Sequence, residues 1–212
     1  MYISYIAFYD EVRATQERDP AAKNIAEVLL LYPGLHAVIA YRTSNFLWRK
    51  KIAFLPRVVS QIARFLTGIE IHPAAQIGPG LFIDHGMGVV VGETTIIGEN
   101  VTLFQGVTLG GTGKETGKRH PTIGDNVVVG AGAKVLGNIK IGSNSYIGAN
   151  AVVLKSVPAN TTVVGVPGRV TKQDGKRMDQ EMDHIHVSDP VMQGLNELRE
   201  KVDALEGKDK KS

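Results

Sequence analysis

The sequence contains no cysteine, which excludes disulfides, cysteine-based metal sites and thiol nucleophiles. A chain without cysteine is compatible with a reducing compartment. Aromatic residues make up only 6% of the 212 residues, whereas glycine occurs 24 times. That bias favours repeated turns and the packing of small side chains over an aromatic-rich core.

Long hydrophobic runs and secretion signals are also lacking. The N-terminal stretch MYISYIAFYDEVRATQERD carries charges throughout, so we do not interpret it as a signal peptide. No run of about 18 apolar residues is present, and no membrane span is expected. The net charge of +3 is small, and no basic stripe with interleaved aromatics suggests nucleic-acid binding. We therefore expect a cytoplasmic protein with neither a membrane nor a nucleic-acid partner.

Residues 1–68 have the spacing of amphipathic helices. In NIAEVLLLYPGLHAVIAYRTSNFLW, apolar residues recur three and four positions apart. Prolines 20, 33 and 56 divide this region into about four short helices. The hydrophobic fraction of 43% leaves room for a core.

From residue 71 the period changes to six, which fits neither a helix nor an ordinary strand. This period predicts a parallel β-helix over residues 69–170, in which each inward aliphatic side chain stacks on its equivalents in neighbouring coils. Three hexads make one triangular coil, giving between four and five coils. The first positions of the hexads are Ile71, Ile77, Ile83, Val91, Ile97, Leu103, Leu109, Ile123, Val129, Val135, Ile141, Ile147 and Val153.

The repeat is interrupted twice, and both interruptions contain histidine. Ile83 and Val91 are eight residues apart, with the stretch DHGMG between them. Leu109 and Ile123 are fourteen residues apart, and the excess is the loop GGTGKETGKRHP. Function tends to lie where a loop departs from a regular scaffold, so both loops are candidate sites.

The chain ends in a polar segment, residues 171–212, in which residues 190–206 resemble a helix with a heptad seam. The seam could form a trimeric coiled coil or pack on its own subunit. The predicted fold class is therefore α+β, with a helical region, a parallel β-helix and a helical tail. The seam residues are Val191, Leu195, Leu198, Val202 and Leu205.

Two other kinds of site fit poorly. The glycine-rich loop matches neither the phosphate-binding loop, because Thr112 and Arg119 stand at key positions, nor the dinucleotide fingerprint, which would need a glycine in place of Thr116. His72, His85 and His120 lack the spacing of zinc ligands, so no metal site is expected. A metal-dependent β-helix lyase remains one alternative function, and a trimerising scaffold without enzymatic activity remains another.

His85 in the first interruption is either a histidine that stabilises a turn or a general base. Two acidic residues favour the base. Asp84 is adjacent, and Glu70 lies fifteen residues earlier, close to the eighteen residues of one coil. A carboxylate beside an imidazole fixes its tautomer and raises its basicity.

Several stretches closely resemble the serine O-acetyltransferase family. They are RDPAA, LHAVIAYRTSNFLW, IHPAAQIGPGLFIDHGMGVVVGET, QGVTLGGTGKETGKRHPTIGDNVVVGAGAKVLGNIKIG and GVPGRV. The resemblance covers about residues 15–170 and implies that the β-helix is left-handed. It also implies acetyl transfer from acetyl-CoA to the hydroxyl of serine, the first step of cysteine biosynthesis, with acetyl-CoA as co-substrate and no tightly bound cofactor. Homoserine or a sugar hydroxyl is the alternative acceptor.

The resemblance assigns roles to individual residues. His85 corresponds to the catalytic base, and Glu70 to its carboxylate partner. Gly111 and Ala131 correspond to coenzyme A positions. The positions that bind serine, and also cysteine as inhibitor, correspond to Asp19, Asp84, Arg119 and His120.

The resemblance also implies an oligomer. The long N-terminal extension that builds a dimer of trimers in enterobacterial relatives is missing, so we expect a homotrimer, with a hexamer as the alternative. Relatives insert a C-terminal isoleucine into cysteine synthase, whereas this chain ends in Ser212. We therefore do not expect a complex with cysteine synthase.

Overall fold

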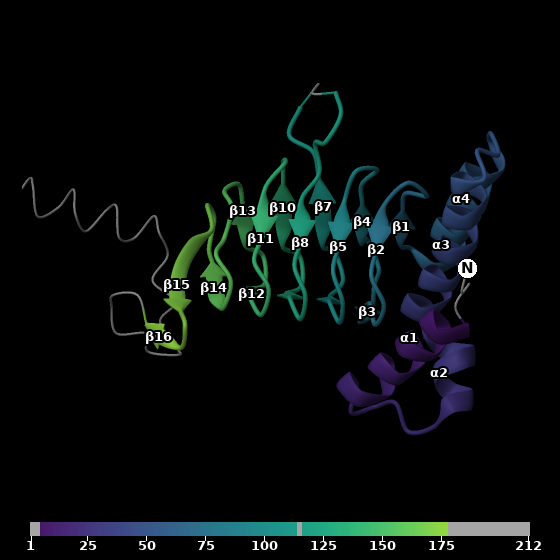
Figure 1. Cartoon of the computed structure of the whole chain (residues 1–212). Helices are drawn as coiled ribbons and strands as arrows, with labels where there is room; N and C mark the ends of the chain where they lie inside the picture. Colours follow the sequence, from purple (N-terminus) through teal and green to yellow (C-terminus); the bar gives the residue numbers. More distant parts are fainter. Residues whose placement is uncertain (1–4, 114–115, 178–212) are drawn as a thin grey trace, which may run out of the picture.

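The computed structural model describes residues 5–113 and 116–177. Four helices come first and a row of short strands follows (Figure 1). The prolines act as predicted, because Pro33 and Pro56 each lie in the first turn of a helix. Gly68 ends the last helix in the left-handed conformation. The helices are α1 (Tyr5–Arg18), α2 (Ile25–Leu31), α3 (Pro33–Arg49) and α4 (Leu55–Thr67).

The strands form three sheets, A, B and C, which wrap around one core as the sides of a triangular coil. Sheet A contains β1 (Glu70–Ile71), β4 (Val90–Val91), β7 (Thr108–Gly110), β10 (Lys134–Leu136) and β13 (Val152–Val153). Sheet B contains β2 (Gln76–Ile77), β5 (Ile96–Ile97), β8 (Thr122–Ile123) and β11 (Lys140–Ile141). Sheet C contains β3 (Phe82–Ile83), β6 (Thr102–Leu103), β9 (Val128–Val129), β12 (Tyr146–Ile147), β14 (Thr161–Val164), β15 (Arg169–Gln173) and β16 (Lys176–Arg177).

The predicted six-residue repeat is confirmed by the core. Every aliphatic residue at a hexad's first position is buried. In sheet A the parallel register stacks Ile71 on Val91, Val91 on Leu109, Leu109 on Val135 and Val135 on Val153. Each buried aliphatic side chain contributes about 1.5–3 kcal/mol relative to exposure. The stacked columns therefore account for most of the stabilisation of the β-helix.

An asparagine ladder runs along the corner between sheets B and C. Asn126, Asn144 and Asn160 each adopt a positive φ, which asparagine tolerates better than most residues. Their side-chain amides donate from coil to coil, from Asn126 to Asn144 at 3.1 Å and from Asn144 to Asn160 at 3.2 Å. Asn160 donates in turn to Asp174 at 3.0 Å. The ladder links successive coils along this corner.

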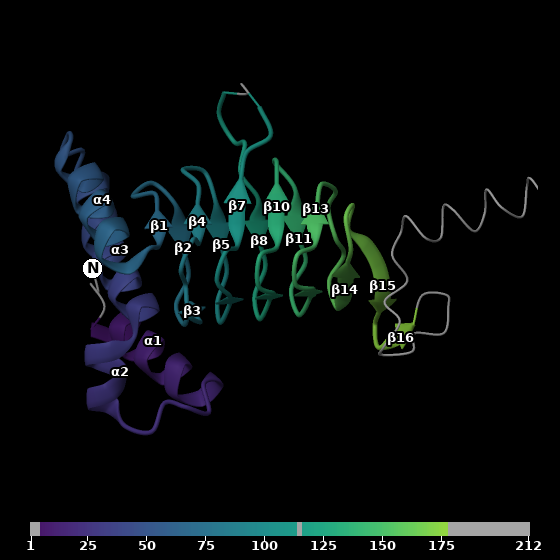
Figure 2. The ribbon, with the colours of Figure 1, turned by 180° about the vertical axis from the view of Figure 1, so that it is seen from behind.

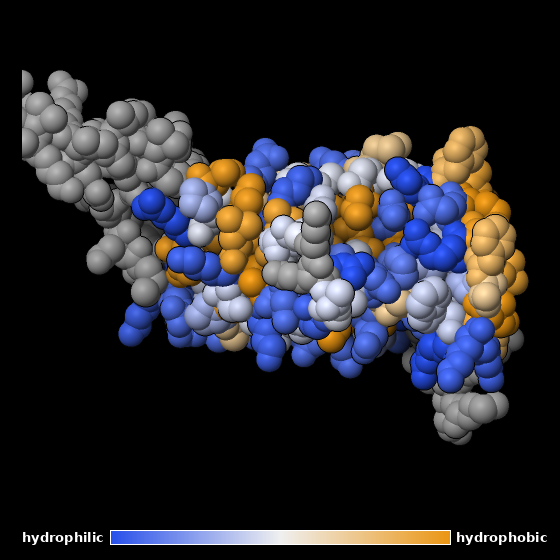
Figure 3. All heavy atoms as spheres, turned by 90° about the horizontal axis from the view of Figure 1, so that it is seen from above, coloured by the Kyte–Doolittle hydropathy of each residue, from blue (hydrophilic) through white to orange (hydrophobic). Residues whose placement is uncertain are grey.

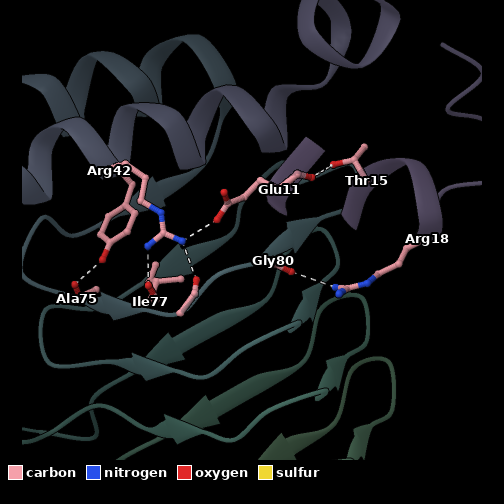
Figure 4. A network of polar contacts seen from close by, with 9 residues as sticks. Glu11, Thr15, Arg18, Arg42, Ala75, Ile77 and Gly80 are labelled. Carbon is pink, nitrogen blue, oxygen red and sulfur yellow. Dashed lines mark hydrogen bonds and ion pairs between the residues drawn. The ribbon is translucent and has the colours of Figure 1, made fainter. Parts of the chain in front are cut away.

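The helices cover the open end of the first coil (Figure 2). The guanidinium of Arg42 donates to the carbonyls of Ile77 and Gly78 at 2.5 and 2.6 Å, and it pairs with the buried carboxylate of Glu11 at 2.6 Å (Figure 4). Burial raises the pKa of Glu11, and Arg42 opposes that shift. The Tyr41 hydroxyl donates to the carbonyl of Ala75 at 2.6 Å. These contacts satisfy carbonyls that an uncapped coil would leave exposed.

The other end of the β-helix is closed by antiparallel strands. Strand β14 pairs with β15, and β15 pairs with β16. The proposed division into residues 1–68, 69–170 and 171–212 stays a prediction. The tail helix at residues 190–206 lies outside the described residues.

Apolar side chains gather on the surface of the helical end, where Figure 3 shows a continuous hydrophobic area. Phe65 and Leu66 of α4 are exposed, as is Leu30 of α2, and Phe65 is 89% exposed. Within the described part of the chain, no single helix is long and apolar enough to cross a membrane; α2 and α3 meet that test only as a pair bent by 69°. Exposed apolar areas of this kind are typical of association surfaces.

Candidate active site

The corner between β3 and β4 presents His85 to solvent. His85, Gly86 and Gly88 all have positive φ, which lets the chain fit the two extra residues of this step. The Gly88 amide donates to the carbonyl of Gly68 at 2.9 Å, which ties the corner to the end of α4. The imidazole of His85 is 74% exposed, with Nε2 4.0 Å from Oδ1 of Asp84. Both ring nitrogens are therefore accessible to a substrate.

Glu70 lies at the start of β1, next to the same corner. Its amide donates to the carbonyl of Val89 at 2.9 Å, and its carboxylate lies 3.4 Å from Nε of Arg64. Among residues 5–113 and 116–177, no hydrogen bond or ion pair joins Glu70 to His85. The pairing of the two side chains stays a prediction.

Asp19 is held in one orientation by two hydrogen bonds. Oδ1 accepts from the amide of Ala21 at 2.7 Å, and Oδ2 accepts from the hydroxyl of Tyr32 at 2.7 Å. The hydrogen bond to Asp19, with burial and the charges of Asp19, Glu27 and Asp84 as smaller causes, raises the pKa of Tyr32 to about 12. The Tyr32 hydroxyl is therefore a donor at any physiological pH.

The start of α3 brings this aspartate towards Asp84. Gly34 packs so closely on β3 that a Cβ atom would lie 2.1 Å from the carbonyl oxygen of Ile83. Only glycine allows that approach, and Tyr32 immediately precedes this turn. Arg18, at the end of α1, donates to the carbonyl of Gly80 at 3.2 Å and fixes the neighbouring segment (Figure 4). The Tyr32 hydroxyl donates to Asp19, and Asp84 is near enough for its charge to contribute to the raised pKa of Tyr32.

Arg119 and His120 lie at the end of the long loop between β7 and β8 and contact the corner that follows β4. Nη2 of Arg119 lies 2.6 Å from Oε2 of Glu93, and the hydroxyl of Thr94 accepts the amides of both Arg119 and His120 at 3.0 and 3.1 Å. The ring of His120 covers Gly92, where a Cβ atom would lie 2.0 Å from Cδ2. Residues 92–94 therefore hold the end of the long loop in place through these contacts.

Two neutral imidazoles belong to this second corner. Burial lowers the pKa of His72 to about 4, with Arg57 as the next cause, and burial also lowers the pKa of His120, followed by the charge of Arg119. Nδ1 of His72 accepts from the amide of Ala74 at 3.0 Å, and Nδ1 of His120 from that of Thr94 at 3.2 Å. Each neutral ring then carries its proton on Nε2 and can donate from there.

The lowered pKa of His72 predicts acid sensitivity. Because the unfolded chain binds a proton near pH 6.5 and the folded chain only near pH 4, the free energy of unfolding should fall as pH drops through that window. We expect a loss on the order of 1–2 kcal/mol once partial exposure is discounted.

His72→Asn keeps an acceptor for the Ala74 amide but cannot titrate. Denaturant unfolding at several pH values should therefore show a flatter slope, with the remainder due to His120. An unchanged slope in the mutant would contradict this origin of acid sensitivity.

The two positions expected to contact coenzyme A lie on different corners, one on the corner of Arg119 and the other on that of His85. Gly111 follows β7, and a Cβ atom there would lie 3.3 Å from the carbonyl oxygen of Arg119. Ala131 lies between β9 and β10, on the same side of the β-helix as His85, and its carbonyl accepts the amide of Asn150 at 2.8 Å. Both positions are small and leave the adjacent backbone accessible.

Most of the candidate residues therefore lie along the two borders of sheet A. The CA edge, between sheets C and A, contains residues 84–89 and 130–133, with Glu70 beside it in β1. The AB edge, between sheets A and B, contains residues 92–95, 111–113 and 116–121. The width of sheet A separates the two edges within one chain. Within the described ranges, no group of three or more His, Asp and Glu side chains is arranged to hold a metal ion.

An apolar hollow of about 410 Å³ lies between α3 and α4. Its lining includes Pro33, Ala40, Ile62 and Leu66, with His36 as its one ionisable residue. It offers no carboxylate and no cation, so the charged groups that catalysis needs lie at the two edges.

Comparison with known proteins agrees with this geometry. Residues 120–155 match the family model described as bacterial transferase hexapeptide (six repeats). A serine acetyltransferase of Staphylococcus xylosus is 58% identical over 194 residues, which cover 92% of this chain and 90% of the relative.

Two solved structures are similar over most of the chain. One is the serine acetyltransferase of Brucella abortus in complex with coenzyme A, at 43% identity and a TM-score of 0.77, covering 79% of this chain and 67% of that one. The other is the soybean serine acetyltransferase complexed with serine, at 49% identity and a TM-score of 0.76, covering 77% and 68%. With the parallel coils of the three sheets, these neighbours confirm the predicted left-handed β-helix.

Proposed function

The chain belongs to the serine acetyltransferase family and catalyses acetyl transfer from acetyl-CoA to the hydroxyl of L-serine, and we propose that it does so directly, with His85 as general base. The observation that supports this assignment is the exposed imidazole of His85 on an irregular corner, with Asp84 beside it. Imidazole is the side chain best suited to accept a proton near neutral pH.

The proposed reaction has two steps. The imidazole of His85 removes the proton of the serine hydroxyl, and the hydroxyl oxygen attacks the thioester carbonyl carbon to give a tetrahedral oxyanion. The oxyanion then collapses, the carbon–sulfur bond breaks, and the imidazolium returns the proton to the sulfur. The products are O-acetylserine and coenzyme A. General-base assistance of this kind typically contributes about 10²–10⁴ in rate.

Serine is a zwitterion, and each of its charges has a partner among the candidate residues. Its ammonium group suits the carboxylates of Asp19 and Asp84. Its carboxylate suits the guanidinium of Arg119, which forms paired hydrogen bonds with carboxylates. His120 can donate from Nε2 to the same carboxylate, because its Nδ1 already accepts from Thr94.

A site that uses both edges requires a second copy of the chain. His85 and Asp84 belong to the CA edge, and Arg119 and His120 belong to the AB edge, with sheet A between them. We propose a homotrimer in which the CA edge of each subunit faces the AB edge of its neighbour. Acetyl-CoA would lie in the groove between them, near Ala131 of one subunit and Gly111 of the next.

A coenzyme A release assay with a panel of hydroxyl acceptors tests the function. L-Serine should give the highest kcat/KM, above homoserine and simple sugars. A higher value for another acceptor would favour the alternative hydroxyl substrate. The cytoplasmic location and the absence of a cysteine synthase complex remain predictions from the sequence.

Replacing Arg119 with alanine should raise the KM for serine about 10–100-fold, because a charge-assisted hydrogen bond is worth about 1.5–3 kcal/mol. The KM for acetyl-CoA should change far less. Cysteine resembles serine, so its inhibition should compete with serine and weaken in the same mutant.

Arg119→Lys is the matched control, since it keeps the charge but loses the planar fork, and its effect on serine should be intermediate. Equal effects of Arg119→Ala on both substrates would contradict this role. Cysteine inhibition that survives unchanged would indicate a separate inhibitory site.

A further inference from the structure

Tyr32 has a position that the assignments above leave unexplained. It precedes α3 as its N-cap residue, yet its side chain makes no capping hydrogen bond to the helix. The hydroxyl is instead directed at Oδ2 of Asp19, at 2.7 Å. The Tyr32 hydroxyl thus contacts a carboxylate of the candidate site and not its own helix, which suggests a role in that site.

The ring of Tyr32 is anchored independently of that hydrogen bond. It packs on the small core of the helical region formed by Val12, Val28 and Leu35. Gly34, two residues later, is pressed against the end of β3, one residue before Asp84. The hydroxyl is therefore fixed from both sides, by the helical core and by the β-helix.

Asp19 depends on this hydroxyl for its orientation. Its Oδ1 accepts from the Ala21 amide in a local turn, which alone would leave the carboxylate free to rotate about one anchored oxygen. The Tyr32 hydroxyl fixes the second oxygen. Each carboxylate oxygen keeps a second lone pair, so an ammonium group can still donate to Asp19.

We propose that Tyr32 is a positioning residue for serine binding, which holds Asp19 in the orientation that, together with Asp84, receives the ammonium group of the substrate. This inference rests on the proposed function, in which Asp19 contacts serine. It predicts that the hydroxyl of Tyr32 matters for serine affinity and has little influence on the chemical step or on coenzyme A.

Tyr32→Phe tests the inference, because it removes only the hydroxyl and keeps the packed ring. The KM for serine should rise about 3–10-fold, in line with the loss of one hydrogen bond to a charged group. The kcat and the KM for acetyl-CoA should stay within about twofold. In an Asp19→Asn background, the added Tyr32→Phe change should produce little further effect, since the two residues act through one contact.

Tyr41→Phe is the matched control. It removes a buried hydroxyl from the same helical region, where Tyr41 donates to the carbonyl of Ala75 at 2.6 Å. That change should lower thermal stability and leave the KM for serine unaltered. If Tyr32→Phe also lowered stability, comparing its KM for serine with its KM for acetyl-CoA would still separate a positioning role from a structural one.

The possible failures are distinguishable. If Asp19→Asn raises the KM for serine and Tyr32→Phe does not, the inference is overturned and the proposed function stands. If Asp19→Asn has no effect on serine, both the ammonium site and the role of Tyr32 are overturned. A full effect of Tyr32→Phe in the Asp19→Asn background would also overturn the inference.

Discussion

Replacing His85 with asparagine is expected to lower kcat by about 10²–10⁴ while the protein stays folded, because the variant loses the group that accepts the proton of serine. Asparagine is the informative choice here. His85 has a φ of 58°, a conformation that asparagine tolerates well and alanine does not. His85→Asn therefore removes the base without straining the corner, and steady-state kinetics with thermal unfolding measures both effects.

The same variant decides between the two interpretations of His85. A histidine that only stabilises the turn is replaced without loss by asparagine, so turnover near that of the wild type would remove His85 from the mechanism. His85→Ala, compared with His85→Asn, isolates the backbone contribution, since alanine should add a loss of stability of about 1 kcal/mol. Under the base assignment the two variants are equally inactive and differ only in stability.

The β-helix could be predicted from the sequence because its repeat has a direct physical cause. Stacked coils require an inward aliphatic residue every six positions, and each of those residues is buried and in register. The antiparallel strands β15 and β16 could not be predicted in this way. They pair beyond the last complete hexad, where no neighbouring coil imposes the period.

The candidate site was predictable to the extent that it interrupts the repeat. Both interruptions, with His85 and with Arg119 and His120, stand out against the regular hexads. Tyr32 and Glu93 do not stand out. Tyr32 lies in an amphipathic helical region where a tyrosine is ordinary, and its relation to Asp19 depends on how α3 packs on Ile83.

The ion pair between Glu70 and Arg64 could not be predicted from the sequence either. It depends on where α4 ends relative to β1, and sequence spacing along the β-helix carries no information about that docking. Glu93 is similar, because its partner Arg119 is brought to it only by the return path of the long loop.

Mixing two defective chains should restore activity if the site lies between subunits. His85→Asn chains keep Arg119 and lack the base, whereas Arg119→Ala chains keep the base and bind serine poorly. In randomly mixed trimers, about a quarter of the interfaces should pair an intact CA edge with an intact AB edge, because each interface uses one edge from each of two chains. At serine concentrations far below the KM of the Arg119→Ala variant, activity should therefore rise from near zero to about a quarter of the wild-type value.

A second mixture, of wild-type chains and chains that carry both substitutions, gives a different fraction of intact sites, and native mass spectrometry of both mixtures controls for subunit exchange. If each site is shared, about a quarter of the interfaces in this mixture are intact, whereas about half of the sites are intact if each chain holds a whole site. Co-refolding followed by the coenzyme A release assay measures both mixtures. In preparations where native mass spectrometry detects mixed trimers, no gain in the first mixture and about half of the wild-type activity in the second would show that one chain contains the whole site and would overturn the arrangement across sheet A.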